Sequence, residues 1–188
     1  MPGKLLIISG PSGSGKTTIT HHLLEKFSDL AFSVSATTRS KRPQESDGKD
    51  YFFLSEKEFR QKISSGEFAE WEEVYPGMFY GTLKMEIERN WALGKTLVFD
   101  VDVRGALNLK NRYPDNSLAV IILPPSKEDL KNRLTKRETE TDIVLERRLA
   151  KAEKEMSMAE FFDVQLINDT LEHSFEKAEK IAEEFLGR

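Results

Sequence analysis

The sequence predicts an α/β fold in which a parallel sheet is flanked by helices on both faces. Short continuous apolar runs, which parallel strands buried on both faces require, recur at residues 5–8, 97–99 and 118–123. Helix-compatible segments separate these runs in the alternating order of β-α-β units. Residues 33–83 and 126–150 do not follow this alternation. We therefore expect two excursions from the core, one mixed and one helical.

The chain has 188 residues, enough for one domain with a substantial core. We assign residues 1–32, 84–125 and 151–188 to this core. Charged residues make up 32% of the chain and hydrophobic ones 38%, and the formal net charge is −4. This balance is typical of globular proteins and gives no indication of a nucleic-acid partner.

Composition also excludes several kinds of site. The chain has no cysteine, which rules out disulfides and cysteine-based metal sites, and its three histidines show no ligand spacing. It has no signal-peptide pattern and no apolar run near the ~18 residues of a membrane span. We therefore expect a cytoplasmic protein with no membrane partner, and homo-oligomerisation stays open.

The most informative stretch is the glycine-rich loop at residues 10–17, which lies between an apolar run and a helix-compatible segment. Glycines let the backbone turn tightly and point several N–H groups at one anion, in front of a helix N-terminus. Lys16 adds a charge for the β- and γ-phosphates, and the Thr17 hydroxyl is placed to ligate Mg²⁺. A chance surface turn would not need the strand and helix around it. We predict a P-loop NTPase-type core whose triphosphate-binding residues are Gly10, Ser12, Gly13, Ser14, Gly15, Lys16, Thr17 and Thr18.

The first half of the chain contains clear start and stop signals. Ser55 and Glu58 form a capping box that begins a helix, and Gly66 ends it. Pro76-Gly77 interrupts an aromatic-rich run, as a turn between two strands does. In order, we expect a strand at 4–9, a helix at 17–27, one short strand at 31–36, a loop at 37–43, a strand at 51–54, a helix from 56, strands within 68–80 and a helix at 82–93.

In the second half, Pro124-Pro125 breaks the most apolar run, and Ser126 with Asp129 can cap the next helix. In order, we expect a strand at 96–102, a helix through Leu107 and Leu109, a strand at 118–123, a helix to about 137, a polar break at 138–142, a charged helix to about 161, a strand at 164–167 and a helix at 171–186.

The mixed excursion carries groups that suit a phosphorylated base. Arg39 and Arg42 lie on a loop that Pro43 keeps extended, so both guanidinium groups can converge on one phosphate. Tyrosine hydroxyls nearby add neutral donors. Ionised Glu70 offers two acceptors, which match the N1–H and N2–H edge of guanine. For Glu70 and each tyrosine alone, an ordinary surface or core role is the alternative.

The helical excursion and the strand end at Asp100 supply further charge. Arg133, Arg137, Arg147 and Arg148 flank the polar break, as arginines of a lid over a transferring phosphoryl group do; a solvated helix face is the alternative. Asp100 is the expected acidic partner for Mg²⁺, with a helix N-cap as the alternative. Residues 102–105 also spell the D-x-x-G signature of regulatory GTPases, but no N-K-x-D motif follows.

Taken together, the motifs resemble those of the guanylate kinase family over nearly the whole chain. They are GPSGSGKTT at 10–18, S-x-T-T-R-x-x-R-P at 35–43, G-K-D-Y at 48–51, G-E-F-x-E-W at 66–71, Y-G-T at 80–82, F-D-V-D at 99–102, the arginine-bearing segment 133–148 and I-N-D at 167–169.

The resemblance implies a GMP-binding excursion at 33–83 and a lid at 126–150. It assigns guanine to Ser35, Glu70, Thr82 and Asp102, and the GMP phosphate to Arg39, Arg42, Tyr51 and Tyr80. It also assigns the ATP phosphates to the loop around Lys16 with Arg133, Arg137 and Arg148, and places Asn168 near the adenine. The chain departs from the family pattern at Gln44, Arg104, Glu138 and the turn before Tyr80, which is about one residue longer.

The function we expect is the ATP-dependent phosphorylation of GMP, and of dGMP, by direct in-line transfer with Mg²⁺. The acceptor phosphate is already anionic, so positioning and charge neutralisation carry the catalysis without a general base. The expected catalytic residues are Lys16, Arg39, Arg133, Arg137 and Arg148. The alternatives are a kinase for another base and a catalytically inactive kinase-like module that binds phosphopeptides.

Overall fold

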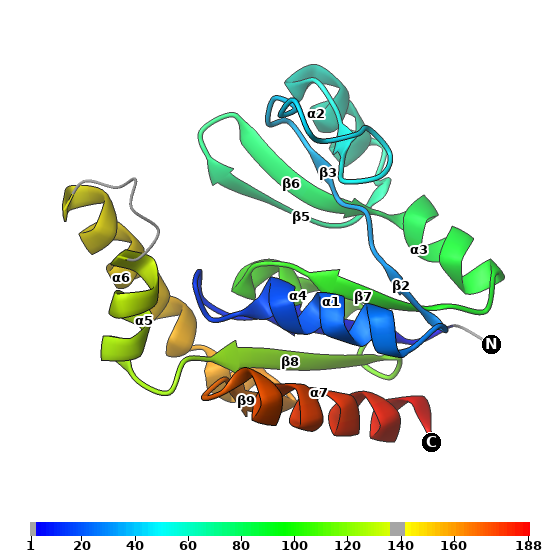
Figure 1. The fold of residues 1–188 in the computed structure, drawn as a ribbon. Helices are drawn as coiled ribbons and strands as arrows, with labels where there is room; N and C mark the ends of the chain where they lie inside the picture. Colours follow the sequence, from blue (N-terminus) through cyan, green and yellow to red (C-terminus); the bar gives the residue numbers. More distant parts are fainter. Residues whose placement is uncertain (1–2, 136–141) are drawn as a thin grey trace.

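The computed structural model describes residues 3–135 and 142–188, and its core is a five-stranded sheet in which all strands run parallel (Figure 1). The predicted fold class is confirmed. The strand order across the sheet is β2 (Leu30–Phe32), β7 (Thr96–Asp100), β1 (Leu5–Ser9), β8 (Ser117–Leu123) and β9 (Val164–Ile167).

Helices cover both faces of this sheet, because side chains alternate along a strand that is buried on both sides. Leu5 and Ile7 of β1 pack with α3 (Lys84–Ala92) and α4 (Val103–Arg112). Leu6 and Ile8 pack with α1 (Lys16–Lys26) and α7 (Leu171–Leu186) on the other face. The predicted strand at 164–167 and helix at 171–186 match the observed bounds.

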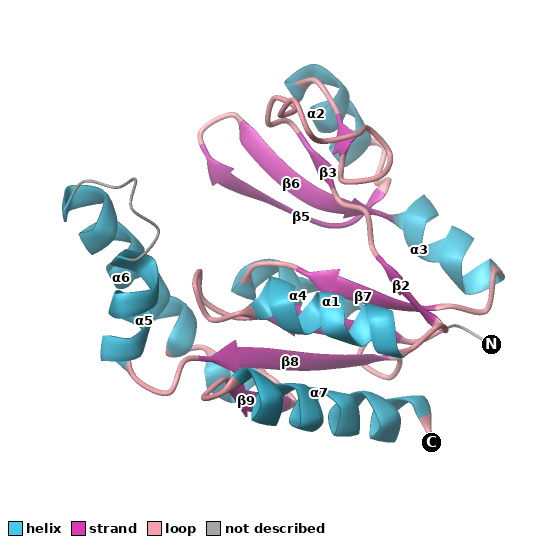
Figure 2. Ribbon diagram, in the orientation of Figure 1, coloured by secondary structure: helices cyan, strands magenta, loops and turns pink. Residues whose placement is uncertain are grey.

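The mixed excursion forms a second, separate sheet (Figure 2). Its strand order is β4 (Phe52–Phe53), β3 (Ala36–Thr37), β6 (Met78–Leu83) and β5 (Phe68–Tyr75), and α2 (Glu56–Ser64) packs on it. Phe59 of α2 is fully buried, with its ring centroid 4.3 Å from that of Phe68 and 5.4 Å from that of Phe79. The predicted capping box at Ser55 and Glu58 is present.

Two predictions about this region are wrong. The run at 31–36 is not one strand: it divides into β2 of the core sheet and β3 of the excursion sheet. Ser33 still donates its backbone N–H to the Val98 carbonyl (2.9 Å), whereas Ala36 pairs with Phe52 and Gly81. The helix expected from residue 82 begins at Lys84 instead, because Thr82 lies in β6 opposite Glu70 of β5.

The helical excursion consists of α5 (Lys127–Thr135) and α6 (Asp142–Met156), which pack through buried Leu130, Leu134 and Ala152. The helix expected to continue to about 161 ends at Met156, and a short 3-10 helix, η1 (Ala159–Phe161), follows it. Arg137 and Glu138 lie outside the described residues. In the part of the chain that the structure describes, no helix is both long and apolar enough to span a membrane.

We expect Phe59→Ala to lower the free energy of unfolding by about 3–5 kcal/mol, because it removes a fully buried ring from the small core of the excursion. Urea denaturation would measure this loss. Phe161→Ala is the matched control, since that ring is 62% exposed and its removal should change stability by about 0.5 kcal/mol or less. Equal losses in the two variants would contradict this account of the excursion core.

Candidate active site

The glycine-rich loop connects the carboxyl end of β1 to α1 and is packed tightly against the neighbouring strands. Gly10, Gly13 and Gly15 all adopt positive φ angles, of 142°, 87° and 98°. A Cβ on Gly10 would lie 2.2 Å from the Ile122 carbonyl oxygen, and one on Gly15 would lie 2.2 Å from Asn168 Nδ2. Glycine is therefore required at these two positions by both backbone conformation and space.

The Lys16 side chain lies across this loop. Its ammonium donates to the carbonyl oxygens of Gly10 (2.7 Å) and Pro11 (3.2 Å). Burial lowers the pKa of Lys16, and the nearby Asp100 carboxylate opposes that shift. The positive charge of Lys16, which we predicted to bind phosphates, is thus held at the loop itself.

The two acidic residues at the end of β7 have different partners. Thr17 Oγ1 donates to Asp100 Oδ2 at 2.7 Å, so the two oxygen groups predicted to hold Mg²⁺ lie in contact. The Asp102 side chain accepts from the Gly105 backbone N–H (2.8 Å) and caps α4. The helix N-cap that we considered for Asp100 is therefore provided by Asp102.

Asn168 lies beneath the loop and is buried. Its Nδ2 donates to the Ser14 carbonyl oxygen (2.6 Å), and its Oδ1 accepts from the Ser174 hydroxyl (2.9 Å). The side chain expected near an adenine thus ties the end of β9 to the loop. This supporting contact was not apparent from the sequence, where Ser14 and Asn168 are 154 positions apart.

Arginines from both helices of the second excursion reach the same loop. Arg133 of α5 donates to the Asn168 carbonyl oxygen at 2.8 Å and to the Ser14 carbonyl oxygen at 3.5 Å. Arg148 of α6 donates to the Ser12 hydroxyl at 2.6 Å. The structure therefore brings together the P-loop and two of the three arginines predicted to act from the lid, and the third, Arg137, lies outside the described residues.

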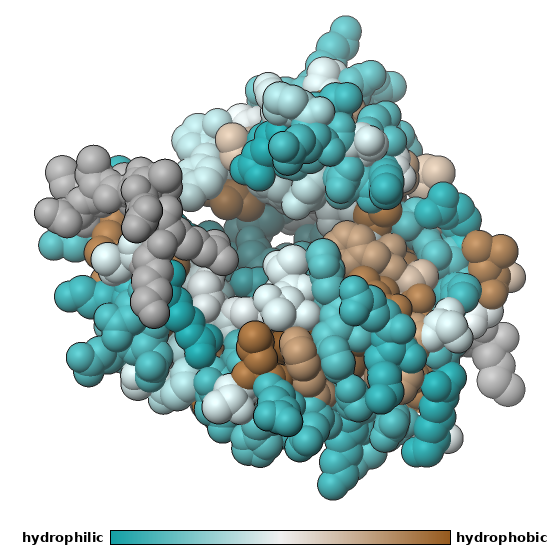
Figure 3. Space-filling view, viewed as in Figure 1, coloured by the Kyte–Doolittle hydropathy of each residue, from teal (hydrophilic) through white to brown (hydrophobic). Residues whose placement is uncertain are grey.

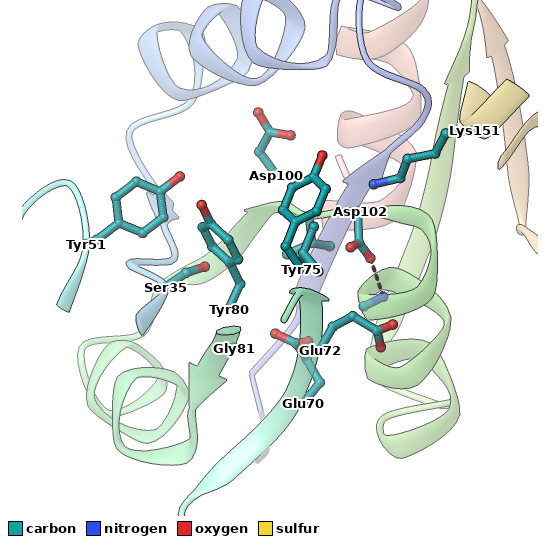
Figure 4. A pocket seen from close by; sticks show the side chains of 13 residues that line it. Ser35, Tyr51, Glu70, Glu72, Tyr75, Tyr80, Gly81, Asp100, Asp102 and Lys151 are labelled. Carbon is teal, nitrogen blue, oxygen red and sulfur yellow. Dashed lines mark hydrogen bonds between the residues drawn. The ribbon is translucent and has the colours of Figure 1, made fainter. Parts of the chain in front are cut away.

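A pocket of about 250 Å³ lies between the excursion sheet and the core. Most of the residues predicted for a guanine nucleotide line it, and Figure 4 shows the hydroxyls of Tyr51 and Tyr80 converging on one another. Thr82 borders it indirectly, through its bond to Glu70. The predicted members on the pocket wall are Ser35, Tyr51, Glu70, Tyr80 and Asp102.

Glu70 is the most unusual group in this pocket. It is 8% exposed, and its Oε1 accepts from Thr82 Oγ1 at 2.8 Å. Burial raises the pKa of Glu70 to about 7, with a smaller contribution in the same direction from Asp102 and an opposing one from the Thr82 hydrogen bond. A carboxyl group is thus held in a protein interior, where its ionised form lacks the solvation of water.

A second pocket, of about 330 Å³, lies over the glycine-rich loop and adjoins the first. Figure 3 shows a hollow between the excursion, the core and the α5–α6 pair. The loop residues Gly10, Ser12, Gly13, Gly15, Lys16, Thr17 and Thr18 line the second pocket. The two pockets share a wall formed by Asp100, Val101, Asp102 and Lys151.

Lys151 and Glu155 of α6 are site residues that sequence reasoning missed. Lys151 lines both pockets and Glu155 the second one, and Lys151 Nζ lies 3.7 Å from Glu155 Oε1. Burial raises the pKa of Glu155. Their i,i+4 spacing was the available signal, but in so charged a helix it resembled the exposed pair Glu153 and Lys154.

The phosphate-binding arginines predicted on the 37–43 loop are arranged around a third residue. Arg39 Nη1 and Nη2 donate to the two carboxylate oxygens of Glu45, at 3.0 and 2.7 Å. The Arg42 backbone N–H donates to Glu45 Oε2 at 2.8 Å, and its side chain is exposed. Glu45 was not singled out in the sequence.

A P-loop core with two adjoining pockets, one over the loop and one under a separate excursion, is the architecture of a nucleoside monophosphate kinase. The guanylate kinase family model matches residues 2–185. A guanylate kinase of Bacteroides fragilis is 50% identical over 184 residues, which cover 98% of this chain and 90% of that protein. One from Thermotoga maritima is 44% identical, over 94% of this chain and 84% of the relative.

The fold gives the same result. A crystal structure of guanylate kinase from Anaplasma phagocytophilum superposes with a TM-score of 0.77 at 31% identity, covering 97% of this chain and 85% of that one. The chain belongs to the guanylate kinase family, as the resemblance predicted. Family membership supports kinase activity on GMP.

We expect Gly15→Ala to weaken ATP binding about tenfold or more, because the new Cβ would collide with Asn168 Nδ2 and displace the loop. Titration calorimetry would measure the affinity. Gly94→Ala is the matched control: its φ is also positive, at 69°, but nothing lies within 4 Å of the added Cβ. An unchanged affinity in Gly15→Ala would show that the loop tolerates the collision.

The raised pKa of Glu70 predicts that stability depends on pH. The neutral form favours the folded state, so its contribution is present below the ordinary pKa of 4.5 and is lost as the pH rises to about 7. Between these values the free energy of unfolding should fall, relative to Glu70→Gln, by up to about 3 kcal/mol. Urea denaturation of both proteins across this range measures the difference. Parallel pH profiles would mean that Glu70 titrates normally.

Proposed function

We propose that the protein transfers the γ-phosphoryl group of ATP directly to the phosphate of GMP, and also of dGMP. One observation carries this proposal: the pocket over the P-loop and the pocket under the excursion share a wall at Asp100, Val101, Asp102 and Lys151. Two nucleotides bound in adjoining pockets would have their phosphates at that common wall. This is the arrangement that a direct transfer requires.

In this proposal the donor phosphates occupy the loop pocket. The backbone N–H groups of the glycine loop and the Lys16 ammonium bind the β- and γ-phosphates. Lys16 would exchange its carbonyl partners at Gly10 and Pro11 for phosphate oxygens. Arg133 and Arg148, which already reach the loop from α5 and α6, add positive charge and exclude water. We propose the same role for Arg137 and an adenine-side position for Asn168.

Thr17 and Asp100 would hold Mg²⁺. Their side-chain oxygens are 2.7 Å apart at the loop pocket, and Mg²⁺ prefers oxygen ligands, with one or two from the protein and the rest from phosphates and water. The ion would supply neutralisation of charge on the donor phosphates. Asp100 also lines the acceptor pocket, so this carboxylate lies at the point where donor and acceptor meet.

The acceptor would bind under the excursion sheet. Ionised Glu70 offers two acceptors to the N1–H and N2–H groups of guanine, and Ser35, Thr82 and Asp102 complete the contacts to the base. Arg39, Arg42, Tyr51 and Tyr80 bind the phosphate. The pKa of Glu70 is raised to about 7, so the carboxyl group is partly protonated near neutral pH. The two N–H donors of guanine would stabilise its ionised form, and binding of guanine would therefore favour loss of the proton.

The transfer itself needs no general base, since the attacking oxygen of GMP is already anionic. The protein contributes alignment of the two phosphates and positive charge around the transferring group. Residues 33–83 and 126–150 act as the acceptor-binding excursion and the lid in this scheme. Closing them over the shared wall would keep water from the reaction.

Coupled measurement of ADP release with ATP·Mg²⁺ tests the proposal directly. We expect turnover with GMP and dGMP, and none comparable with AMP, CMP or UMP. A preference for another monophosphate would identify a kinase for a different base. Nucleotide binding without any turnover would favour the phosphopeptide-binding module instead.

We expect Lys16→Ala to lower kcat by at least about 100-fold, because it removes a charge that neutralises the transferring phosphoryl group. Arg39→Ala should reduce kcat/KM for GMP by a similar factor. Lys180→Ala, an exposed substitution on α7, serves as the control and should leave turnover unchanged. Near-normal turnover in both Lys16→Ala and Arg39→Ala would contradict the assigned roles.

A further inference from the structure

Arg39 and Glu45 form an ion pair close to the acceptor pocket, where Arg39 packs against Tyr51 of the pocket wall. Both oxygens of the carboxylate accept from the guanidinium, at 2.7 and 3.0 Å, so the pair is bidentate. The two side chains are only 15% and 16% exposed, although they belong to a surface loop. A shielded bidentate pair fixes both distance and orientation, which a single exposed ion pair does not.

Glu45 also organises the loop between the two arginines. Its Oε2 accepts from the Arg42 backbone N–H (2.8 Å), and its own backbone N–H donates to the Arg42 carbonyl oxygen (3.1 Å). These bonds make a closed turn from Arg42 to Glu45. One carboxylate thus connects the side chain of Arg39 with the backbone of Arg42.

The guanidinium is fixed on its other side by the aromatic wall of the excursion. Arg39 Cζ lies 5.3 Å from the ring centroid of Tyr51 and 5.7 Å from that of Phe53. Tyr51 in turn packs edge-on against Tyr80, with centroids 6.1 Å apart, and both tyrosines line the acceptor pocket. Glu45 therefore holds Arg39 beside a tyrosine that lines the acceptor pocket.

The pair leaves Arg39 able to bind a second anion. Its bonds to Glu45 and to the Ser40 carbonyl oxygen use three donors of the guanidinium. A guanidinium has five N–H donors, and Tyr80 is a further hydrogen-bonding partner of Arg39, so at least one donor is left for another acceptor. Glu45 and a phosphate can therefore share one guanidinium.

From this geometry we propose that Glu45 is a positioning residue for the acceptor nucleotide. It holds Arg39, and through the turn also Arg42, in the orientation that receives the GMP phosphate. This inference rests on the acceptor subsite proposed above. It assigns no contact between Glu45 and the nucleotide.

The alternative to positioning is that Glu45 competes with the nucleotide phosphate for Arg39. Arg39 lowers the pKa of Glu45 to about 2, so the carboxylate is ionised at neutral pH. A negative charge beside a phosphate site repels the ligand, and a carboxylate that occupied the phosphate position would have to be displaced. Positioning and competition predict changes of opposite sign when the charge is removed.

The test is steady-state kinetics of Glu45→Gln with GMP and ATP varied separately. The amide nearly keeps the size of the carboxylate, but it loses the charge and can no longer accept at both ends of the fork. We expect KM for GMP to rise about tenfold, with a smaller change in kcat and no change in KM for ATP. Calorimetric titration of GMP into the same variant should show the same loss of affinity.

Two further variants separate positioning from a general loss of structure. Glu45→Asp keeps the charge and should restore part of the GMP affinity that Glu45→Gln loses. Glu56→Gln is the matched control, because Glu56 forms an ion pair with Arg60 on the same excursion, but at an exposed site. It should leave KM for GMP unchanged.

A double-mutant cycle with Arg39→Ala tests whether Glu45 acts through Arg39. If it does, Glu45→Gln should have little further effect on GMP affinity when Arg39 is already absent. A lower KM for GMP in Glu45→Gln would establish competition and overturn the proposal. Full additivity in the cycle, or an equal rise in KM for ATP, would also overturn it.

The outcome for the unchanged protein distinguishes this inference from the proposed function. If the protein neither binds nor phosphorylates GMP, the acceptor subsite and the role of Glu45 are both wrong. If it phosphorylates GMP and Glu45→Gln behaves like Glu56→Gln, only the role of Glu45 is wrong.

Discussion

The close packing of the glycine-rich loop against the carboxyl edge of the core sheet is the constraint on which the rest of the structure depends. Neither Gly10 nor Gly15 has room for a Cβ, and the buried amide of Asn168 holds the Ser14 carbonyl from below. With this carbonyl and these glycines fixed in place, the loop keeps a conformation in which backbone N–H groups can bind an anion. Arg133 and Arg148 bond to the same loop, which ties the helical excursion to the core.

The acidic groups of the two adjoining pockets have different partners. In the pocket over the P-loop, Lys16 lies near Asp100, whose carboxylate accepts a hydrogen bond from Thr17. In the pocket under the excursion sheet, burial raises the pKa of Glu70 despite its hydrogen bond from Thr82, and this lowers the stability of the folded protein at neutral pH. A base with two donors would stabilise that ionised carboxylate. We infer that the same burial of Glu70 that lowers the stability of the folded protein also lets the pocket select a base with two donors.

Local signals in the sequence predicted most of the elements correctly. The capping box at Ser55 and the turn at Pro76-Gly77 were both placed correctly, because caps and turns depend on residues a few positions apart. The P-loop was identified for the same reason. Residues whose role depends on distant partners were harder to place. Lys151 and Glu45 resembled ordinary surface charges until the fold placed one at the wall between two pockets and the other against Arg39.

The sequence by itself determined the fold class, the phosphate loop and the family, since these follow from apolar patterning and short contiguous motifs. Only the tertiary structure decided where the chain leaves the core, because pairing with distant strands divides residues 31–36 between two sheets. It also decided that Asp102 caps a helix while Asp100 bonds to Thr17 across 83 positions. Burial and long-range pairing set these outcomes, and neither is encoded in the residues next to each site.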